Sequence, residues 1–150
     1  MYEVKPLKAE DILYVVETGV KELGLKAHTN SDIAKLAEER EESGMCVTGF
    51  VDGIIIGCGG IDMLWEGVGE AWLLLTPYIN QKPKEGYRCI LKGFKQLIEN
   101  NNLRRIQGYG RIGFHEAHNL FSHLKFKPEG IARKYTPDGV DCILYALIKD

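Results

Sequence analysis

The fold is decided by residues 69–101, GEAWLLLTPYINQKPKEGYRCILKGFKQLIENN. Their first part, residues 70–76, is a nearly continuous apolar run, which is the pattern of a central strand covered on both faces. Pro77 and Pro83 then bracket an irregular loop. Beyond the loop, apolar residues recur at helical spacing, namely Tyr87, Ile90, Leu91, Phe94, Leu97 and Ile98. The segment therefore predicts a buried strand, a proline-marked loop and an amphipathic helix that ends at residues 100–102.

The residues before this segment predict a strand, two helices and a hairpin. The strand is expected at residues 2–6, and a helix follows at residues 12–24, where apolar residues keep a helical period. A second helix begins at residues 30–32, whose side-chain oxygens suit an N-cap, and ends at Gly44. Asp52-Gly53 supplies the positive φ angles of a tight turn, so residues 45–51 and 54–64 are expected to pair as antiparallel strands.

The residues after the segment predict a strand at residues 104–109, a helix at residues 117–124 and a closing hairpin. The hairpin pairs residues 127–135 with residues 140–148 around the turn Pro137-Asp138-Gly139. The complete order is βααβββαβαββ. Hairpins combined with one β-helix-β unit require a mixed, mainly antiparallel sheet with helices on both faces, so the predicted fold class is α/β.

Composition limits the range of functions. The chain has 150 residues, 45% of them apolar, and no repeat or linker divides it, so we expect a single domain over residues 1–150. A formal charge of -2 provides no field that would attract nucleic acid or an anionic membrane, so neither is an expected partner. The four cysteines are scattered, which favours reduced, buried thiols. The sequence shows no leader peptide and no membrane-spanning apolar run, which favours a cytoplasmic location.

Four motifs, together with the order of the elements, carry a resemblance to a known family. They are the hairpin VDGIIIG at residues 51–57, the strand end LLLTP at residues 73–77, the segment AHNLFSHLKF at residues 117–126 and the closing hairpin. Over nearly its whole length the chain resembles the GNAT superfamily of acyl-CoA-dependent N-acyltransferases. Residues 129–139 are similar to small phage-related members of that superfamily.

The resemblance implies a site for acetyl-CoA. In this fold the pantetheine arm lies between strands four and five and binds backbone groups of strand four. The pyrophosphate lies at the N-terminus of helix three, where free N–H groups and the helix dipole favour an anion. The family motif Q/R-x-x-G-x-G/A corresponds here to QKPKEG at residues 81–86. The expected cofactor contacts are Leu74, Leu75, Thr76, Gln81, Lys82, Lys84, Glu85, Gly86, Tyr87, Arg88 and Asn119.

Lys84 departs from this motif, because it stands at the first glycine position. Its side chain either adds a charge for a phosphate or obstructs the close approach that glycine permits. We favour phosphate contact, because Lys82, Lys84 and Arg88 cluster on a chain that is otherwise slightly acidic. The alternative is an ordinary solvated helix start.

Acetyl transfer to an amine requires a base for the ammonium, donors for the oxyanion and an acid for the departing thiolate. Glu70 is the expected base, because some relatives carry a catalytic Glu near the start of strand four; the alternative is a strand-end carboxylate in solvent. Tyr109 is expected at the catalytic centre, where it and Arg111 would orient the acceptor; the alternative is that Gly108 and Gly110 mark only a bend of the chain.

The acid is the component that the sequence supplies least well. Many relatives use a Tyr of helix four, but Phe121 stands at that position, and Lys125 stands where they usually have Gly. His115 or His118 is then the substitute acid or base, and the alternative is a structural or solvent-facing role. His115-Glu-Ala-His118 is one residue short of the H-E-x-x-H zinc motif, so no metal site is predicted.

A glycine-rich run, GCGG at residues 57–60, lies inside strand three. It lacks the third glycine of a dinucleotide-binding loop and the Lys-Ser/Thr of a P-loop, so it predicts a bulge or close packing rather than a nucleotide site.

Two functions of different class remain. The first is an N-acetyltransferase that moves an acetyl group by direct transfer from acetyl-CoA to a primary amine of a small molecule or a peptide. The second is a non-catalytic GNAT-fold protein, a phage-related structural or regulatory component with or without CoA binding, which Phe121 and Lys84 favour. A weaker third is an interaction module formed by the first two helices near Trp65. The closing hairpin is also able to pair between subunits, so a homodimer is a candidate assembly.

Overall fold

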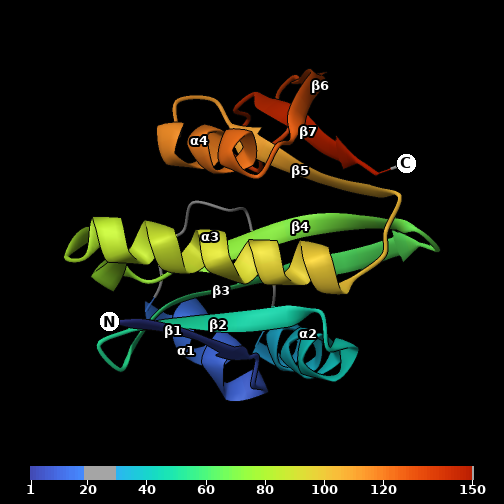
Figure 1. The fold of residues 1–150 in the computed structure, drawn as a ribbon. Coiled ribbons are helices and arrows are strands. Elements are labelled where there is room, and N and C mark those ends of the chain that lie inside the picture. Colours follow the sequence, from blue (N-terminus) through green and yellow to red (C-terminus); the bar gives the residue numbers. More distant parts are fainter. Residues whose placement is uncertain (19–29, 150) are drawn as a thin grey trace. The chain divides into compact units, whose positions relative to one another are not determined.

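The computed structural model describes residues 1–18 and 30–149 (Figure 1). Its elements follow in the order β1 (Tyr2–Pro6), α1 (Ala9–Thr18), α2 (Asn30–Ser43), β2 (Cys46–Val51), β3 (Ile54–Trp65), β4 (Val68–Leu75), η1 (Pro77–Asn80), α3 (Pro83–Asn100), β5 (Arg105–Arg111), α4 (His115–His123), β6 (Lys127–Ala132) and β7 (Cys142–Ile148). This order confirms the prediction, with a 3-10 helix, η1, added in the proline-marked loop. The predicted extension of the first helix to residue 24 lies outside the described residues.

Two boundaries differ from the prediction for identifiable reasons. α3 begins at Pro83, before the apolar period starts at Tyr87. Proline suits the first helical position, because its fixed φ angle is helical and its missing N–H would have no partner there. β6 ends at Ala132 rather than at residue 135. Lys134 has a φ angle of 51°, which takes the chain out of the extended conformation.

The strands hydrogen-bond in the order β1-β2-β3-β4-β5-β7-β6. The pairings of β1 with β2, β2 with β3, β5 with β7 and β6 with β7 are antiparallel, and that of β4 with β5 is parallel. The predicted mixed, mainly antiparallel sheet is confirmed.

The hairpin of β2 and β3 has the predicted turn, because Asp52 and Gly53 have φ angles of 50° and 80°. Its irregularity lies in β3, where Gly57 pairs with Gly49 and Ile55 with Phe50, so that Ile56 is left without a partner in β2. This bulge directly precedes the glycine-rich run.

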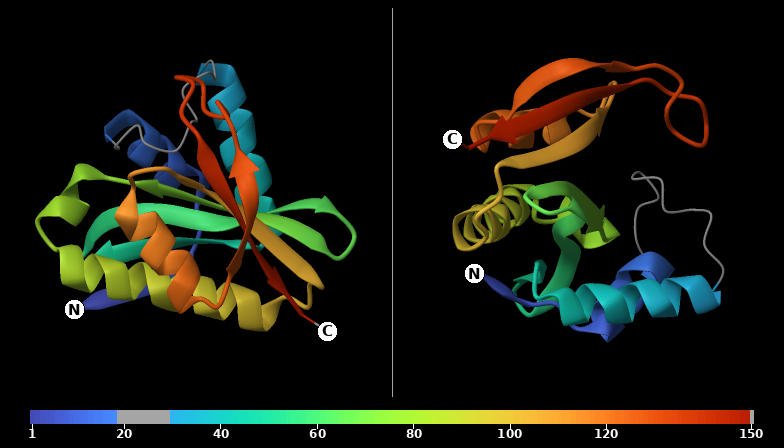
Figure 2. Two further views of the ribbon diagram at one scale, coloured as in Figure 1. Left: turned by 90° about the horizontal axis from the view of Figure 1, so that it is seen from above. Right: turned by 90° about the vertical axis from the view of Figure 1, so that its right-hand side faces the viewer.

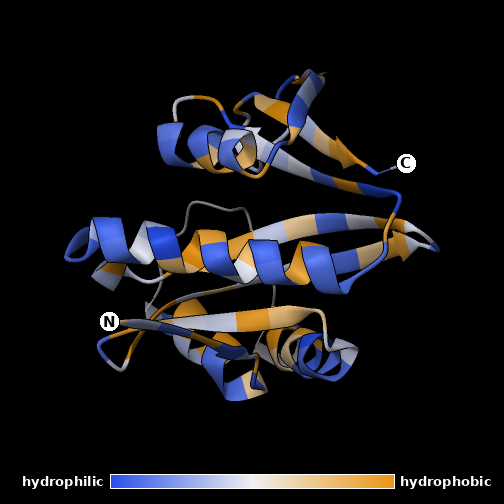
Figure 3. Cartoon of the chain, in the orientation of Figure 1, coloured by the Kyte–Doolittle hydropathy of each residue, from blue (hydrophilic) through white to orange (hydrophobic). Residues whose placement is uncertain are grey.

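The first compact unit comprises Met1–Asp62 and Trp72–Asn101. Helices cover both faces of its strands (Figure 2). On one face α1 and α2 enclose a core of buried residues, namely Leu7, Ile12, Val15, Ala37, Cys46, Cys58 and Leu74. On the other face α3 buries Cys89, Gly93, Phe94 and Leu97. Hydrophobic and hydrophilic segments alternate along α3, as predicted for an amphipathic helix (Figure 3).

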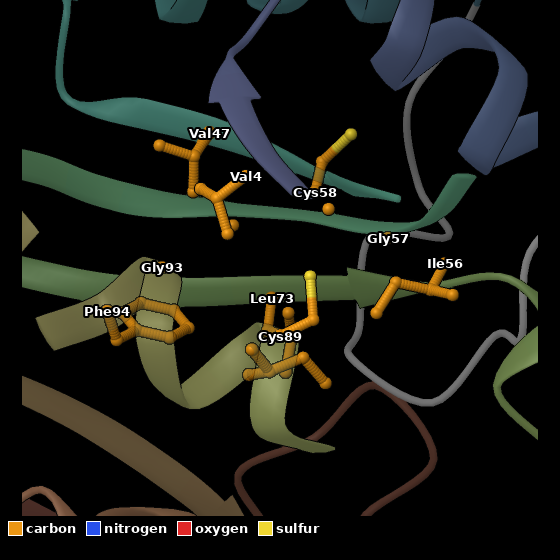
Figure 4. Close-up of a pocket in the computed structure, with 12 residues that line it drawn as sticks. Val4, Val47, Ile56, Gly57, Cys58, Leu73, Cys89, Gly93 and Phe94 are labelled. Atoms are coloured by element: carbon orange, nitrogen blue, oxygen red, sulfur yellow. The ribbon is translucent and has the colours of Figure 1, made fainter. Parts of the chain in front are cut away.

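Glycines of β3 let the neighbouring elements approach closely. A Cβ on Gly59 would lie 3.1 Å from the ring of Phe94, and one on Gly57 would collide with the carbonyl oxygen of Leu74. The space left between α3 and the strands is an apolar cavity of about 20 Å³ (Figure 4). This volume holds at most one water molecule, so the glycine-rich run serves close packing.

The second compact unit comprises Met63–Ala71 and Asn102–Asp150. Side chains alternate along its strand β5. Ile106, Gly108 and Gly110 are buried on one face, and the half-buried residues of the other face are Arg105, Gln107, Tyr109 and Arg111. A Cβ on Gly108 would lie 2.7 Å from the ring of Phe121, so glycine lets α4 pack directly on β5.

α4 ends in a Schellman motif. The N–H of Phe126 donates to the carbonyl of Phe121 at 2.9 Å, and the N–H of Lys125 donates to that of Ser122 at 3.0 Å. The rings of Phe121 and Phe126 provide the accompanying hydrophobic contact, with centroids 5.2 Å apart. Lys125 has the left-handed φ angle of 72° that this position requires, a conformation that glycine adopts with less strain.

All four cysteines are free and buried, as predicted. Burial raises the pKa of each thiol, and that of Cys58 reaches about 12. Among the helices of the described residues, none has the length and apolar character needed to cross a membrane.

Candidate active site

The N-terminus of α3 presents backbone N–H groups without an acceptor. Pro83 has no N–H, and that of Gly86 donates to the carbonyl of Lys82 at 2.8 Å. The N–H groups of Lys84 and Glu85 belong to the first turn, which no helical carbonyl precedes, and they find no acceptor among residues 1–18 and 30–149. Together with the helix dipole, these two amides favour an anion.

The three basic side chains near this terminus differ in their surroundings. Nζ of Lys82 lies 3.5 Å from a carboxylate oxygen of Asp52 and 4.0 Å from one of Glu85. Lys84 and Arg88 are exposed, one helical turn apart, and neither forms an ion pair within the described part of the chain. The predicted phosphate cluster therefore divides into Lys84 and Arg88, which are available to an anion, and Lys82, which already faces two carboxylates.

Packing explains the glycine of the phosphate motif. A Cβ on Gly86 would collide with Cδ1 of Ile79, so any larger residue would have to displace this terminal methyl group of η1. Gln81, the C-cap of η1, is exposed, and Tyr87 is half-buried with a pKa that burial raises. The motif residues thus form one continuous loop and helix start.

Leu74 of β4 and Thr76, which directly follows β4, direct their backbone groups toward β3. The N–H of Thr76 donates to the carbonyl of Ile56 at 2.9 Å, and the carbonyl of Leu74 faces Gly57. Backbone groups alternate in direction along a strand, so those of Leu75 point away from β3. Of the three residues, Leu75 has the backbone groups best directed toward a ligand.

Glu70 is tied into a chain of hydrogen bonds on the half-buried face of β5. It pairs in register with Gln107, whose Nε2 donates to Oε1 of Glu70 at 3.0 Å. Oε1 of Gln107 accepts a hydrogen bond from Nε of Arg105 at 3.0 Å. Arg105 in turn donates through Nη1 and Nη2 to both carboxylate oxygens of Glu129, at 3.0 and 2.7 Å. These bonds raise the pKa of Arg105 and lower that of Glu129.

A pair of stacked tyrosines lies beside this chain. The rings of Tyr109 and Tyr135 are 4.3 Å apart between centroids and inclined by 16°. Burial raises the pKa of Tyr135, and the neighbouring Tyr109 and Glu70 raise it further. The structure therefore brings Glu70 and Tyr109 of the predicted site together and adds Tyr135.

Arg111 lies at the end of β5 and is paired. Its guanidinium donates to both oxygens of Asp138 at 3.1 and 2.5 Å. Hydrogen bonds from Arg111 and Thr136 hold the pKa of Asp138 well below its usual range. To orient an acceptor as predicted, the guanidinium of Arg111 would have to give up hydrogen bonds to Asp138.

α4 contributes a histidine that is fixed and one that is not. Nε2 of His118 lies 2.9 Å from the carbonyl oxygen of Arg111, which only accepts, so Nε2 carries the proton. Nδ1 then accepts from the hydroxyl of Tyr145 at 2.6 Å. His115 is exposed at the start of α4 and has no hydrogen-bond partner among the residues that the structure describes. Asn119 is exposed on the same helix.

Phe121 of α4 packs on Gly108 of β5 and against the aromatic rings of Tyr145 and Phe126. Its ring stacks on that of Tyr145 with centroids 4.6 Å apart and an inclination of 18°. The side chain therefore serves packing at the position where the resemblance led us to expect a tyrosine acid.

Within residues 1–18 and 30–149, no three His, Cys, Asp or Glu side chains are placed to hold a metal ion.

An open hollow lies apart from the predicted site. It has a volume of about 680 Å³ and is lined by Trp65, Glu66, Gly67, Asn102, Leu103, Arg104 and Lys149. None of the predicted site residues lines it.

Comparison with known proteins gives a clear result for the fold. Neither a family model nor a curated protein matches the sequence. Solved structures match nearly all of the chain. An acetyltransferase of the GNAT family from Streptococcus pneumoniae has a TM-score of 0.72 at 13% identity, over 99% of this chain and 100% of that one.

Two further structures agree with this match. A protein described as an acetyltransferase from Salmonella typhimurium, solved with acetyl-CoA, has a TM-score of 0.77 at 10% identity, over 100% of this chain and 95% of that one. A chimera of the spermidine N-acetyltransferase from Vibrio cholerae has a TM-score of 0.75 at 13% identity. The match covers 98% of this chain and 95% of the chimera. At these identities the match establishes the fold, which is that of the GNAT acetyltransferases.

Proposed function

We propose that this protein is an N-acetyltransferase that moves an acetyl group from acetyl-CoA to a primary amine. The observation that carries the proposal is the start of α3. Within the described part of the chain, two N–H groups there have no acceptor, and two neighbouring cations, Lys84 and Arg88, form no ion pair. Such a position suits the pyrophosphate of coenzyme A. The structural neighbours add support, since one was solved with acetyl-CoA and another is named for a spermidine substrate.

In this proposal the cofactor is held along the loop from β4 to α3. The amides of Lys84 and Glu85 and the side chains of Lys84 and Arg88 bind phosphate oxygens, with Gln81, Lys82, Gly86 and Tyr87 shaping the loop. Leu75 offers its outward backbone groups to the pantetheine amides, flanked by Leu74 and Thr76. Asn119 on α4 is a further amide-binding side chain.

The acceptor amine reacts beside Glu70. Water or the carboxylate itself removes a proton from the ammonium, and the stacked rings of Tyr109 and Tyr135 favour a cation at their faces. The neutral amine then attacks the thioester carbonyl carbon and forms a tetrahedral oxyanion. The attacking nitrogen gives its second proton to water. Collapse of the intermediate then breaks the carbon–sulfur bond, and the thiolate leaves with a proton for which His115 is the proposed donor.

A second candidate is supported by one specific observation. Phe121 has no hydroxyl and packs against Tyr145 and Phe126, so the acid that many relatives use is absent from its position. A GNAT-fold protein that binds acetyl-CoA without turnover would tolerate this arrangement.

Thiol release from acetyl-CoA in the presence of a broad panel of primary amines separates the two candidates. We expect amine-dependent release and a product heavier than the amine by one acetyl group. Glu70→Gln should lower the rate about a hundredfold or more, whereas the matched exposed control Glu99→Gln on α3 should not change it. If acetyl-CoA stabilises the fold but no amine releases thiol, the non-catalytic candidate is correct.

A further inference from the structure

The hydrogen-bond chain on β5 fixes the orientation of one particular amide, that of Gln107. Nε of Arg105 is only a donor, so the Gln107 atom 3.0 Å away must be the carbonyl oxygen Oε1. The amide nitrogen Nε2 therefore has to face Oε1 of Glu70. Arg105 itself cannot rotate freely, because Glu129 holds the other two nitrogens of its guanidinium.

The consequence at Glu70 is a carboxylate with one oxygen occupied and one available. Oε1 accepts the bond from Gln107, while Oε2 accepts no hydrogen bond among the residues that the structure describes. The neutral amide holds one carboxylate oxygen in place without adding a charge that would repel an ammonium. The second oxygen is left to meet the amine or a water molecule, so this arrangement suits the role proposed for Glu70.

From this geometry we propose that Gln107 is a positioning residue for Glu70 and that Arg105, held by Glu129, fixes Gln107 in the donating orientation. The inference rests on the proposed function, because it assigns these residues to the base of that reaction. The charged and titratable groups that face Glu70 and Gln107 are Arg105 and Tyr109 from β5, Glu129 from β6 and Tyr135 from the loop between β6 and β7.

The contacts suggest a contribution to rate rather than to stability. The side chains of Arg105 and Glu129 are 24% and 38% exposed, and ion pairs at this exposure contribute little to the free energy of unfolding. The bond between Gln107 and Glu70 is only part-buried. Replacing Gln107 should therefore leave the fold intact while releasing the carboxylate.

A double-mutant cycle tests the proposal. Gln107→Leu removes the donor at similar side-chain size and should lower kcat about tenfold, with the KM for acetyl-CoA changed less than twofold. In a Glu70→Gln background the same substitution should change kcat less than twofold, because a positioning residue has nothing left to position. Gln96→Leu on α3 is the matched control and should leave kcat unchanged. Equal effects of Gln107→Leu in both backgrounds would overturn the proposal.

Arg105→Lys provides a second variant that keeps the charge but loses the Nε donor. We expect a loss of kcat smaller than that of Gln107→Leu and dependent on Gln107. An Arg105→Lys enzyme with the kcat of the parent would contradict the role of Arg105.

A readout without turnover keeps the test independent of the amine panel. In ¹H–¹⁵N spectra the side-chain amide of Gln107 should show one downfield proton, which moves upfield in Glu70→Ala and stays in place in Glu99→Gln. If the chemical shift of this amide proton is the same in Glu70→Ala as in the parent, the inference is overturned even in an active enzyme. Absence of thiol release by the parent would instead overturn the proposed function, and the inference with it.

Discussion

The hydroxyl of Tyr145 donates to Nδ1 of His118 at 2.6 Å, and Nε2 of the same ring donates to the carbonyl of Arg111 at 2.9 Å. Both ring nitrogens of His118 are thus used to join α4 to β5 and β7. His115, one turn earlier, makes no such bond within residues 1–18 and 30–149. The two histidines of the HEAH segment therefore have separable roles.

Replacing His118 by alanine should lower mainly the free energy of unfolding, whereas replacing His115 should lower mainly kcat. His118→Ala leaves the hydroxyl of Tyr145 without its acceptor and removes one donor to the carbonyl of Arg111, which keeps the N–H of Phe114 at 3.1 Å, so we expect a loss of about 1–3 kcal/mol in the free energy of unfolding. His115→Ala should cost less than about 0.5 kcal/mol but lower kcat about tenfold or more. Urea unfolding and thiol release measure the two effects. A His115→Ala enzyme with unchanged kcat would exclude His115 as the acid.

Charge removal at the start of α3 should weaken acetyl-CoA binding. Lys84→Ala and Arg88→Ala each remove an exposed cation without an ion pair, and we expect the Kd to rise about threefold to tenfold for each. Lys95→Ala removes the same charge further along the helix and serves as the control. Titration calorimetry at low and high salt checks this, because added salt should reduce the difference. If Lys95→Ala weakens acetyl-CoA binding as much as Lys84→Ala, the loss of affinity comes from the change in net charge. The phosphate groups then do not bind at the start of α3.

Gly86→Ala tests the packing of η1 on α3. The added Cβ collides with Ile79, so we expect a loss of about 1–3 kcal/mol in the free energy of unfolding. Gly130→Ala is the control, because a Cβ there meets nothing within 4 Å. The double variant Gly86→Ala/Ile79→Ala should lose less than the sum of the two single variants. Strictly additive losses would show that the collision is not the cause.

The cysteines should be unreactive in the folded protein. Burial raises the pKa of each thiol, that of Cys58 to about 12, so the reactive thiolate is scarce at pH 7 to 9. We expect no rapid reaction with an aromatic disulfide reagent in buffer and four reactive thiols in denaturant. Because the folded-state pKa is raised, Cys58 should stay protonated until the pH approaches that value. Rapid native reaction at pH 8 would contradict the described burial.

Much of the fold was predictable because its signals are local. The apolar period of α3 and the Asp52-Gly53 turn each lie within a few consecutive residues, and the structure has both. The start of α3 was missed, since Lys84, Glu85 and Gly86 interrupt the apolar period, although Pro83 is a signal for the first helical position. The conformation of Lys125 also follows a local rule, because a helix C-terminus of this type needs a left-handed residue.

The candidate site was less predictable, because its contacts join distant residues. Glu70 and Gln107 meet through the parallel register of β4 and β5, which no single segment specifies. Tyr135 reaches Tyr109 through the return of the closing hairpin. Alternation along β5 was the available signal, because it places Arg105, Gln107, Tyr109 and Arg111 on one face.

The most direct test of the account is thermal unfolding at increasing acetyl-CoA concentration. A ligand that binds only the folded protein stabilises it in proportion to the logarithm of its concentration, by about 2.7 kcal/mol at a hundred times Kd. We expect a steady rise in Tm for the parent and a smaller rise for Lys84→Ala at each concentration. A Tm that does not move up to millimolar acetyl-CoA would contradict it.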